Sequence, residues 1–289
     1  MRDSYSKKAI NIIKEDGVGV FLNRSGKYAL YKSTEFKNEI LWSKYFSYQD
    51  KFNFQTKKNS LLNNILYEIP ADPHKKIVIK PSDIDYRIKF HPEKHGTVIP
   101  LPKNGGIGQI RGGDWDSNKC KERIENNKVL NAFKKRFVFG EEWEETEYYK
   151  YIHNKSSDDF LEKKEYDSAN KYLKDRFRKY DSFYNDVKNN GYEWGHTGEC
   201  MDPKQTQPVR DQLEVLVTID RYGDIHFWEG NHRFAIARIL NLEIPAHVVC
   251  RHKDWQDTRD KIYNNKTAIS NEGLDSHPDL QDVFETYRQ

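Results

Sequence analysis

Cysteine is scarce in this sequence and is never paired at close spacing. The chain has 3 cysteines among 289 residues, at positions 120, 200 and 250, with no Cys-x-x-Cys motif. An odd number of widely spaced cysteines disfavours both a disulfide framework and a zinc site built from thiolates. A reducing compartment fits this pattern best, and we expect a cytoplasmic protein.

Long apolar runs are also lacking. No run reaches the roughly 18 apolar residues that a transmembrane helix requires, and the first 17 residues lack the apolar core of a secretion signal. A short apolar stripe of Ala9, Ile10, Ile12 and Ile13 predicts a helix that stops at Gly17. We expect this helix to pack on its own domain, although the stripe leaves peripheral contact with a membrane surface open.

Neither sign of charge is in excess. The 48 basic and 45 acidic residues leave a net charge of +3, which excludes a strongly cationic protein that coats DNA. Any nucleic-acid role would need a local basic patch. The runs KKRF at 134–137 and RFRKYDSFY at 176–184 have acids interleaved around them and predict solvated helix faces instead. With 13% aromatic and 32% charged residues, the chain is typical of a folded protein with a polar surface.

The hydrophobic pattern divides the chain into five segments. They are a helical or irregular start at 1–70, a strand and a glycine-rich loop at 71–117, a charged helical insertion at 118–170, a helix followed by strand, turn, strand, helix and strand at 171–255, and a tail at 256–289. Gly191 predicts the end of the helix that opens the fourth segment, and Pro278 marks a short helix in the tail. The prediction is an α+β fold, with a small mixed sheet interrupted by a helical insertion.

The stretch Glu229-Gly230-Asn231-His232-Arg233 stands between a predicted strand and a predicted helix. Gly230 permits close backbone approach, and Asn231 is well suited to cap the helix. A phosphate at this turn would be held by helix amides, by the helix dipole and by the Arg233 guanidinium, with His232 as a further donor. Because Glu229 would repel a bare phosphate, it indicates a divalent cation such as Mg²⁺ between the two.

The same turn also has an explanation without a ligand. Asn231 would then only cap the helix, Arg233 would pair with a nearby acid, and Glu229 would be solvated.

Two other motifs carry carboxylates. In IRGGDWD, Asp114 and Asp116 lie two residues apart and could hold Mg²⁺. A turn in which these side chains bond their own backbone explains the motif equally well. The acidic and aromatic run GEEWEETEYYKY at 140–151 predicts a solvated helix whose Trp and Tyr side chains are buried.

The order of these elements resembles the ParB/sulfiredoxin superfamily. The turn at 230–233 matches the Gly-x-x-Arg turn of that family, and NLEIPAHV at 241–248 matches its sequel. Upstream, FYNDVKNNGY at 183–192 resembles the helix that precedes the family's second strand, and IVIKPSDID at 77–85 resembles the family's opening strand and the turn after it. The resemblance covers about 170–252 with a separate piece near 76–90, and it implies a ParB/sulfiredoxin-type sheet interrupted by the helical insertion.

Departures from the family pattern separate its branches. Asn231 stands where sulfiredoxins carry a catalytic cysteine, so sulfinic acid reduction is not expected. After His252 the chain offers no helix-turn-helix region like that of the chromosome-partitioning ParB proteins. The Asp-Gly-His-Thr-Arg turn of the free serine kinase branch is nearest to residues 229–233. Resemblance to that branch implies phosphoryl transfer.

The sequence therefore predicts a nucleotide-dependent phosphotransferase, or kinase. Its phosphate-binding residues would be Gly230, Asn231, His232 and Arg233, and the nucleotide would be ATP or another. Glu229 with Asp114 or Asp116 would hold Mg²⁺, and one of these acids would orient the hydroxyl of an unidentified acceptor. The alternatives are a ParB-like protein that binds or cleaves DNA, and a module that senses nucleotide without turnover. A steep salt dependence of binding would identify the DNA-binding alternative.

Overall fold

The computed structural model describes residues 48–89, 105–193, 213–264 and 274–286. The chain divides into two compact units, Met1–Lys51 and Phe52–Gln289, and the description below concerns the second. The helix predicted around Ile10 and residues 90–104 of the segment predicted as strand and glycine-rich loop lie outside the described residues. Among the helices of the described ranges, none is both long enough and apolar enough to cross a membrane.

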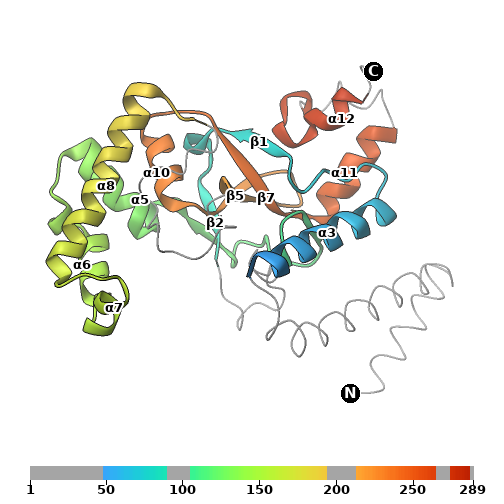
Figure 1. Cartoon of the computed structure of the whole chain (residues 1–289). Helices are drawn as coiled ribbons and strands as arrows, with labels where there is room; N and C mark the ends of the chain where they lie inside the picture. Colours follow the sequence, from blue (N-terminus) through green and yellow to red (C-terminus); the bar gives the residue numbers. More distant parts are fainter. Residues whose placement is uncertain (1–47, 90–104, 194–212, 265–273, 287–289) are drawn as a thin grey trace. The chain divides into compact units, whose positions relative to one another are not determined.

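The described strands of the second unit form one mixed, seven-stranded sheet (Figure 1). Its order is β1 (Lys76–Ile79), β7 (Ile244–His252), β5 (Val215–Ile219), β6 (Ile225–Glu229), β2 (Tyr86–Ile88) and β4 (Lys121–Arg123), while β3 (Gln109–Arg111) pairs with the end of β7. Neighbours β5 and β7 are parallel, whereas β5 and β6 form an antiparallel hairpin. With the helices described below, this is the predicted α+β class.

The two central strands are buried along their whole length. The strand β5 has the sequence VLVTI and β7 has IPAHVVCRH, and every residue of both is buried. Near-continuous apolar runs of this kind are typical of strands covered on both faces. These two strands are consequently the fixed frame on which the neighbouring helices pack.

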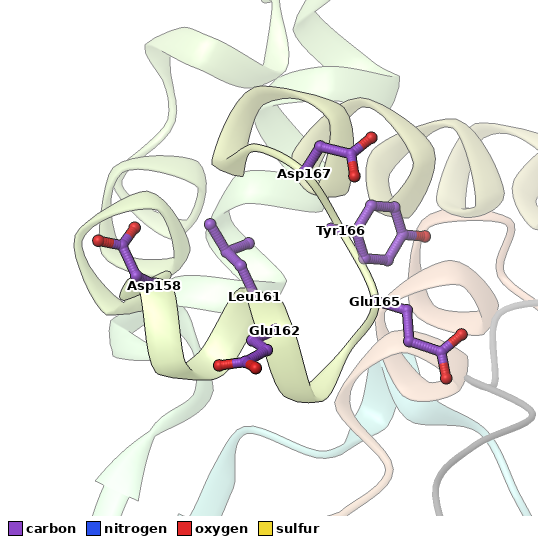
Figure 2. Close-up of a pocket in the computed structure, with 6 residues that line it drawn as sticks. All are labelled: Asp158, Leu161, Glu162, Glu165, Tyr166 and Asp167. Atoms are coloured by element: carbon purple, nitrogen blue, oxygen red, sulfur yellow. The ribbon is translucent and has the colours of Figure 1, made fainter.

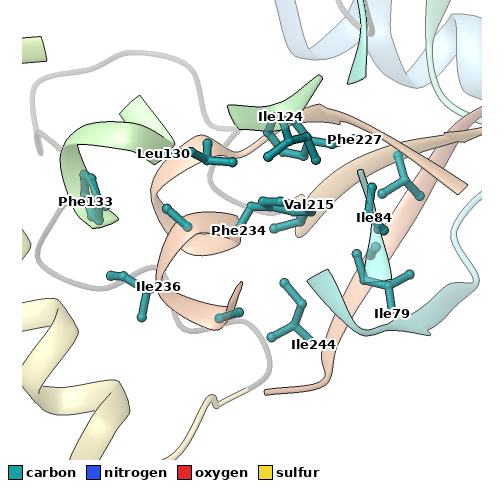
Figure 3. Packing of buried hydrophobic residues seen from close by; sticks show 14 of the residues in the cluster. Ile79, Ile84, Ile124, Leu130, Phe133, Val215, Phe227, Phe234, Ile236 and Ile244 are labelled. Atoms are coloured by element: carbon teal, nitrogen blue, oxygen red, sulfur yellow. The ribbon is translucent and has the colours of Figure 1, made fainter. Parts of the chain in front are cut away.

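Helix α10 (Asn231–Ile239) packs between the sheet and α5 (Lys128–Phe139). The contact consists of apolar side chains from all three elements, which Figure 3 shows around Val215, Phe227, Phe234 and Phe133. The rings of Phe227 and Phe234 lie 4.3 Å apart between centroids. Each fully buried side chain of this size contributes about 1.5–3 kcal/mol. This packing fixes where α10 begins, and therefore where the glycine turn before it lies.

The helical insertion contains α5, α6 (Glu147–Lys155) and α7 (Asp158–Lys163), and it continues into α8 (Ala169–Asn190). Figure 1 shows these helices gathered beside α10, away from α11 and α12. Gly191 ends α8 as predicted. Two boundaries differ from the expectation: residues 121–123 form β4, which pairs with β2, and α8 runs unbroken through residue 170. Three strand residues carry too little periodicity to be distinguished from a helix by pattern alone.

The segment predicted as a tail is tied to the sheet by buried charges. It contains α11 (Lys253–Asn264) and α12 (Gln281–Glu285), with the short helix expected near Pro278 formed by Pro278–Leu280. The buried carboxylate of Asp279 accepts hydrogen bonds from Arg251 Nε at 2.9 Å and from Trp255 Nε1 at 2.9 Å. Arg259 also pairs with it, at 3.4 Å. The described residues after 256 thus contribute to the core, through Ile262, Leu280 and Val283.

Asp279→Asn should destabilise the protein, because it leaves two buried arginines short of their counter-charge. We expect the free energy of unfolding to fall by roughly 3–5 kcal/mol, measured by urea denaturation. Glu285→Gln, which removes an exposed carboxylate 3.5 Å from Lys75, is the control and should change stability by less than about 1 kcal/mol. Equal losses in both variants would contradict this role of Asp279.

The Asp279 carboxylate should also make the stability of the fold depend on pH in the acidic range. Burial by itself would raise the pKa of Asp279, but the charges of Arg251 and Arg259 lower this pKa to about 2 from 3.8. Since the folded-state pKa is depressed, the contribution is complete above about pH 4 and is lost as pH falls towards 2. Wild-type protein should lose stability over that window more steeply than Asp279→Asn, as followed by denaturation at a series of pH values.

Candidate functional site

Helix α10 begins directly after a glycine in the left-handed region. Gly230 has φ 99° and ψ 39°, and a Cβ added to it would lie 3.2 Å from the Cα of Val215 in β5. Both the backbone conformation and the close approach to the sheet therefore require glycine. The predicted close backbone approach is present, and it is made to the protein's own strand.

The first amides of α10 have no side-chain cap. Asn231, predicted to be the cap, is instead the first helical residue, because the left-handed Gly230 takes the capping position. Its side-chain oxygen accepts a hydrogen bond of 2.7 Å from Asn127 Nδ2. Within the described ranges, no acceptor bonds the amides of Asn231, His232 or Arg233. Three donors and the positive end of the helix dipole consequently lie together at this turn.

The Arg233 guanidinium is hydrogen-bonded to acceptors within the protein. It donates to the Leu213 carbonyl at 2.7 Å and to Glu214 Oε2 at 3.3 Å. The Glu214 side chain is 1% exposed, so the pair is nearly withdrawn from water. Arg233 was expected either to bind phosphate or to pair with a nearby acid, and in the structure it pairs with the acid Glu214. Its side chain anchors α10 to the start of β5, and its backbone amide is what faces the turn.

The His232 imidazole lies among aromatic rings of the insertion. Its Nε2 is 3.1 Å from the Tyr148 hydroxyl, and its ring centroid is 4.4 Å from that of Tyr180. Burial, followed by the charges of Arg176 and Arg233, lowers the pKa of His232 to about 3. The imidazole is therefore neutral at physiological pH and adds no positive charge to the turn.

Asp114 and Asp116 form a cluster with Arg221 rather than with Glu229. Arg221 donates to Asp116 through Nε at 2.8 Å and to Asp114 through Nη2 at 2.9 Å. Burial would raise the pKa of Asp116, but the hydrogen bonds from Arg221 keep that pKa below its usual value. The neighbouring turn between β5 and β6 contains Asp220, whose buried carboxylate forms an ion pair of 2.8 Å with Lys121 Nζ.

The predicted carboxylates are not brought together. Arg221, which binds the two aspartates, lies in the turn that precedes β6, whereas Glu229 is the last residue of that strand. At about 3.3 Å per residue, five strand residues separate these ends by on the order of 15 Å. No group of three candidate metal ligands occurs among the described residues. Asp114 and Asp116 therefore cannot share one Mg²⁺ with Glu229 in this arrangement.

A hollow of about 490 Å³ lies where α7 leads into α8 (Figure 2). Its lining is acidic, formed by Asp158, Leu161, Glu162, Glu165, Tyr166 and Asp167. The carboxylates spread apart around the hollow instead of converging on a centre. One of them, Asp167, pairs with Lys171 at 3.0 Å. The hollow therefore lacks the convergent oxygens that a bound cation needs.

Comparison of the chain with protein-family models, with curated proteins and with solved structures finds no match.

Gly230→Ala should cost more stability than Gly140→Ala, which is its matched control. Both glycines have positive φ, 99° and 74°, but a Cβ at Gly140 would meet nothing within 4 Å. Alanine at 140 should therefore cost only the left-handed conformation, roughly 1–2 kcal/mol. At 230, crowding against Val215 should add about 1–3 kcal/mol. Equal midpoints in urea denaturation would show that the approach to β5 is not tight.

Asp116→Asn should destabilise the fold more than Asp114→Asn. The Asp116 side chain is 2% exposed and that of Asp114 is 84% exposed, although both bond Arg221. Weakening the buried, charge-assisted contact should lower the free energy of unfolding by about 1.5–3 kcal/mol, and the exposed one by less than about 1 kcal/mol. Thermal denaturation of the two variants gives the comparison, and a larger loss in Asp114→Asn would contradict the structural role of Asp116.

Proposed function

We propose that this protein binds a nucleotide through its phosphates at the turn before α10 and transfers a phosphoryl group to a hydroxyl-bearing acceptor. The observation that carries the proposal is the uncapped start of α10, where the amides of Asn231, His232 and Arg233 have no acceptor within the described ranges. Helix starts with free amides after a glycine bind phosphate oxygens. The resemblance to the ParB/sulfiredoxin superfamily, and to its kinase branch, points to the same turn.

The structure changes the roles within this proposal. Arg233 positions the helix through Glu214, so the phosphate contacts are assigned to the backbone of residues 230–233. Glu229, the last residue of β6, is the one predicted carboxylate adjacent to the turn. Mg²⁺ in proteins commonly uses one or two carboxylates together with phosphate oxygens and waters, which fits a site with a single acid. When bound, it would neutralise phosphate charge. We place this activity in the cytoplasm.

A second candidate is a module that senses nucleotide without turnover. It is favoured by the separation of the acids, because Asp114 and Asp116 are held by Arg221 at the other end of the hairpin. Only Glu229 of the predicted acids then remains to orient an acceptor. Nucleotide binding without nucleotide consumption, over a broad panel of hydroxyl-bearing acceptors, would select this candidate.

The DNA-binding alternative gains nothing from the basic run at 134–137. Lys135 pairs with Glu141 at 3.1 Å, and Arg136 pairs with Glu142 at 2.8 Å. Arg136 also contacts Asp181 at 3.3 Å. Two of the cations that a phosphate backbone would need are thus already compensated.

Glu229→Gln tests the proposal through its effect on magnesium dependence. Without Mg²⁺ the variant should bind ATP as well as or better than wild type, because a carboxylate that repels phosphate is gone. With Mg²⁺ it should lose most of the metal-dependent gain in affinity and at least about tenfold in nucleotide consumption, a change of roughly 1.4 kcal/mol. Isothermal titration and a consumption assay measure the two effects.

Glu243→Gln is the matched control, since Glu243 is an exposed acid beyond the opposite end of α10. It should behave as wild type in both measurements. Failure of wild-type protein to bind any nucleotide, with or without Mg²⁺, would sink the proposed function.

A further inference from the structure

Arg176 of α8 is the centre of a polar cluster in the helical insertion. Its Nη1 donates to the Tyr172 hydroxyl at 2.6 Å, and its Nη2 donates to the Tyr148 hydroxyl at 3.2 Å. The guanidinium also lies 5.6 Å from the ring centroid of Tyr180. The Tyr148 hydroxyl is in turn 3.1 Å from His232 Nε2, which joins the cluster to the first turn of α10.

The positive charge of Arg176 is not balanced by an acid of the described residues. The two acids nearest to it along α8 are committed elsewhere: Asp175 pairs with Arg178 at 3.4 Å, and Asp181 pairs with Arg136 at 3.3 Å. His232 carries no compensating negative charge. The hydroxyls and ring faces around this half-buried guanidinium supply only partial negative charge, so they compensate its lost hydration less fully than a carboxylate would.

Two donors of the cluster also lack acceptors. Arg176 Nε is closed to solvent and has no hydrogen-bond partner. The Tyr172 hydroxyl accepts from Arg176, so its own proton remains to be donated, and no acceptor for it occurs in the described parts of the chain. Buried donors without acceptors are rare in folded proteins and call for an explanation. An oxyanion supplies several acceptor oxygens and a negative charge at once.

We propose that Arg176, Tyr172 and Tyr148 form a binding site for an oxyanion of the phosphate type. A guanidinium presents a planar fork of donors that matches phosphate geometry, and phenol hydroxyls add neutral donors beside it. On binding, phosphate oxygens take over guanidinium donors now used by the tyrosine hydroxyls, and those hydroxyls turn their protons to the anion. The site lies within the helical insertion and does not rest on the nucleotide site at Gly230.

Titration of the whole chain with inorganic phosphate tests this site. Wild-type protein should bind phosphate, and Arg176→Gln should weaken binding by about ten- to a hundredfold, the effect of losing a charge-assisted contact. The milder Tyr172→Phe removes a single hydroxyl and should weaken binding by less. Arg178→Gln is the matched control, because Arg178 lies two residues further along α8 with a side chain that is 74% exposed. It removes the same charge and should leave phosphate binding unchanged.

Thermal denaturation separates binding from a purely structural role. Without phosphate, Arg176→Met should melt at or above the wild-type temperature, because it removes an uncompensated charge. With phosphate, only wild type and Arg178→Gln should gain stability. A melting temperature for Arg176→Met that is lowered equally with and without phosphate would assign Arg176 to structure and overturn the proposal.

The remaining outcomes are distinct from those for the nucleotide site. No phosphate binding by wild type, or equal weakening by Arg176→Gln and Arg178→Gln, would overturn the oxyanion site alone. Phosphate binding that depends on Arg176 in a protein that ignores ATP would support this site while sinking the proposed function. Phosphate binding retained in Gly230→Ala but lost on adding Arg176→Gln would show directly that the two sites are separate.

Discussion

The buried carboxylate of Glu214 joins the elements that surround the candidate site. It accepts from Arg233 of α10 at 3.3 Å and from the Tyr192 hydroxyl beyond α8 at 2.9 Å, and it pairs with Lys76 of β1 at 3.4 Å. Its own amide donates to Nδ1 of His247 in β7. Burial, followed by the charge of Lys76, lowers the pKa of His247 to about 4, which keeps that nitrogen available as an acceptor. Because a carboxylate taken out of water must be compensated, these partners hold α10 against the start of β5.

The position of Glu214 decides what the glycine turn can offer a ligand. Its pairing with Arg233 removes the guanidinium that the sequence motif presents and leaves the backbone amides of α10 as donors. The β5–β6 hairpin then separates the acids, with Glu229 at one end and the Arg221 cluster at the other. This arrangement offers helix amides and the helix dipole, with one carboxylate nearby, and differs from a site built by convergent acids.

Arg176 differs from three other arginines of the described residues whose side chains are largely withdrawn from water. Arg251 and Arg259 share Asp279, and Arg259 also reaches Asp282 at 2.7 Å. Arg233 has Glu214. Each of these guanidiniums therefore meets a carboxylate, in keeping with the high cost of an unpaired buried charge. Arg176 meets tyrosine hydroxyls and ring faces instead, and this contrast within one chain is the physical basis for assigning it a ligand.

The sequence by itself determined the α+β class, the helix closed by Gly191, the strand, turn and strand after it, and the helix that follows the glycine turn at 230. These follow from local periodicity and from glycines whose backbone conformation only a helix end or a tight turn requires. Partners of charged side chains depend on which strands become neighbours, and local pattern carries no such information. Only the tertiary structure decided that Arg233 pairs with Glu214 and that Asp116 pairs with Arg221, 105 residues away in the sequence. It also decided that Asp279 pairs with Arg251 of β7. The same assembly left Arg176 among tyrosines, because α8 packs against α6 and α10 at a place where neither supplies an acid.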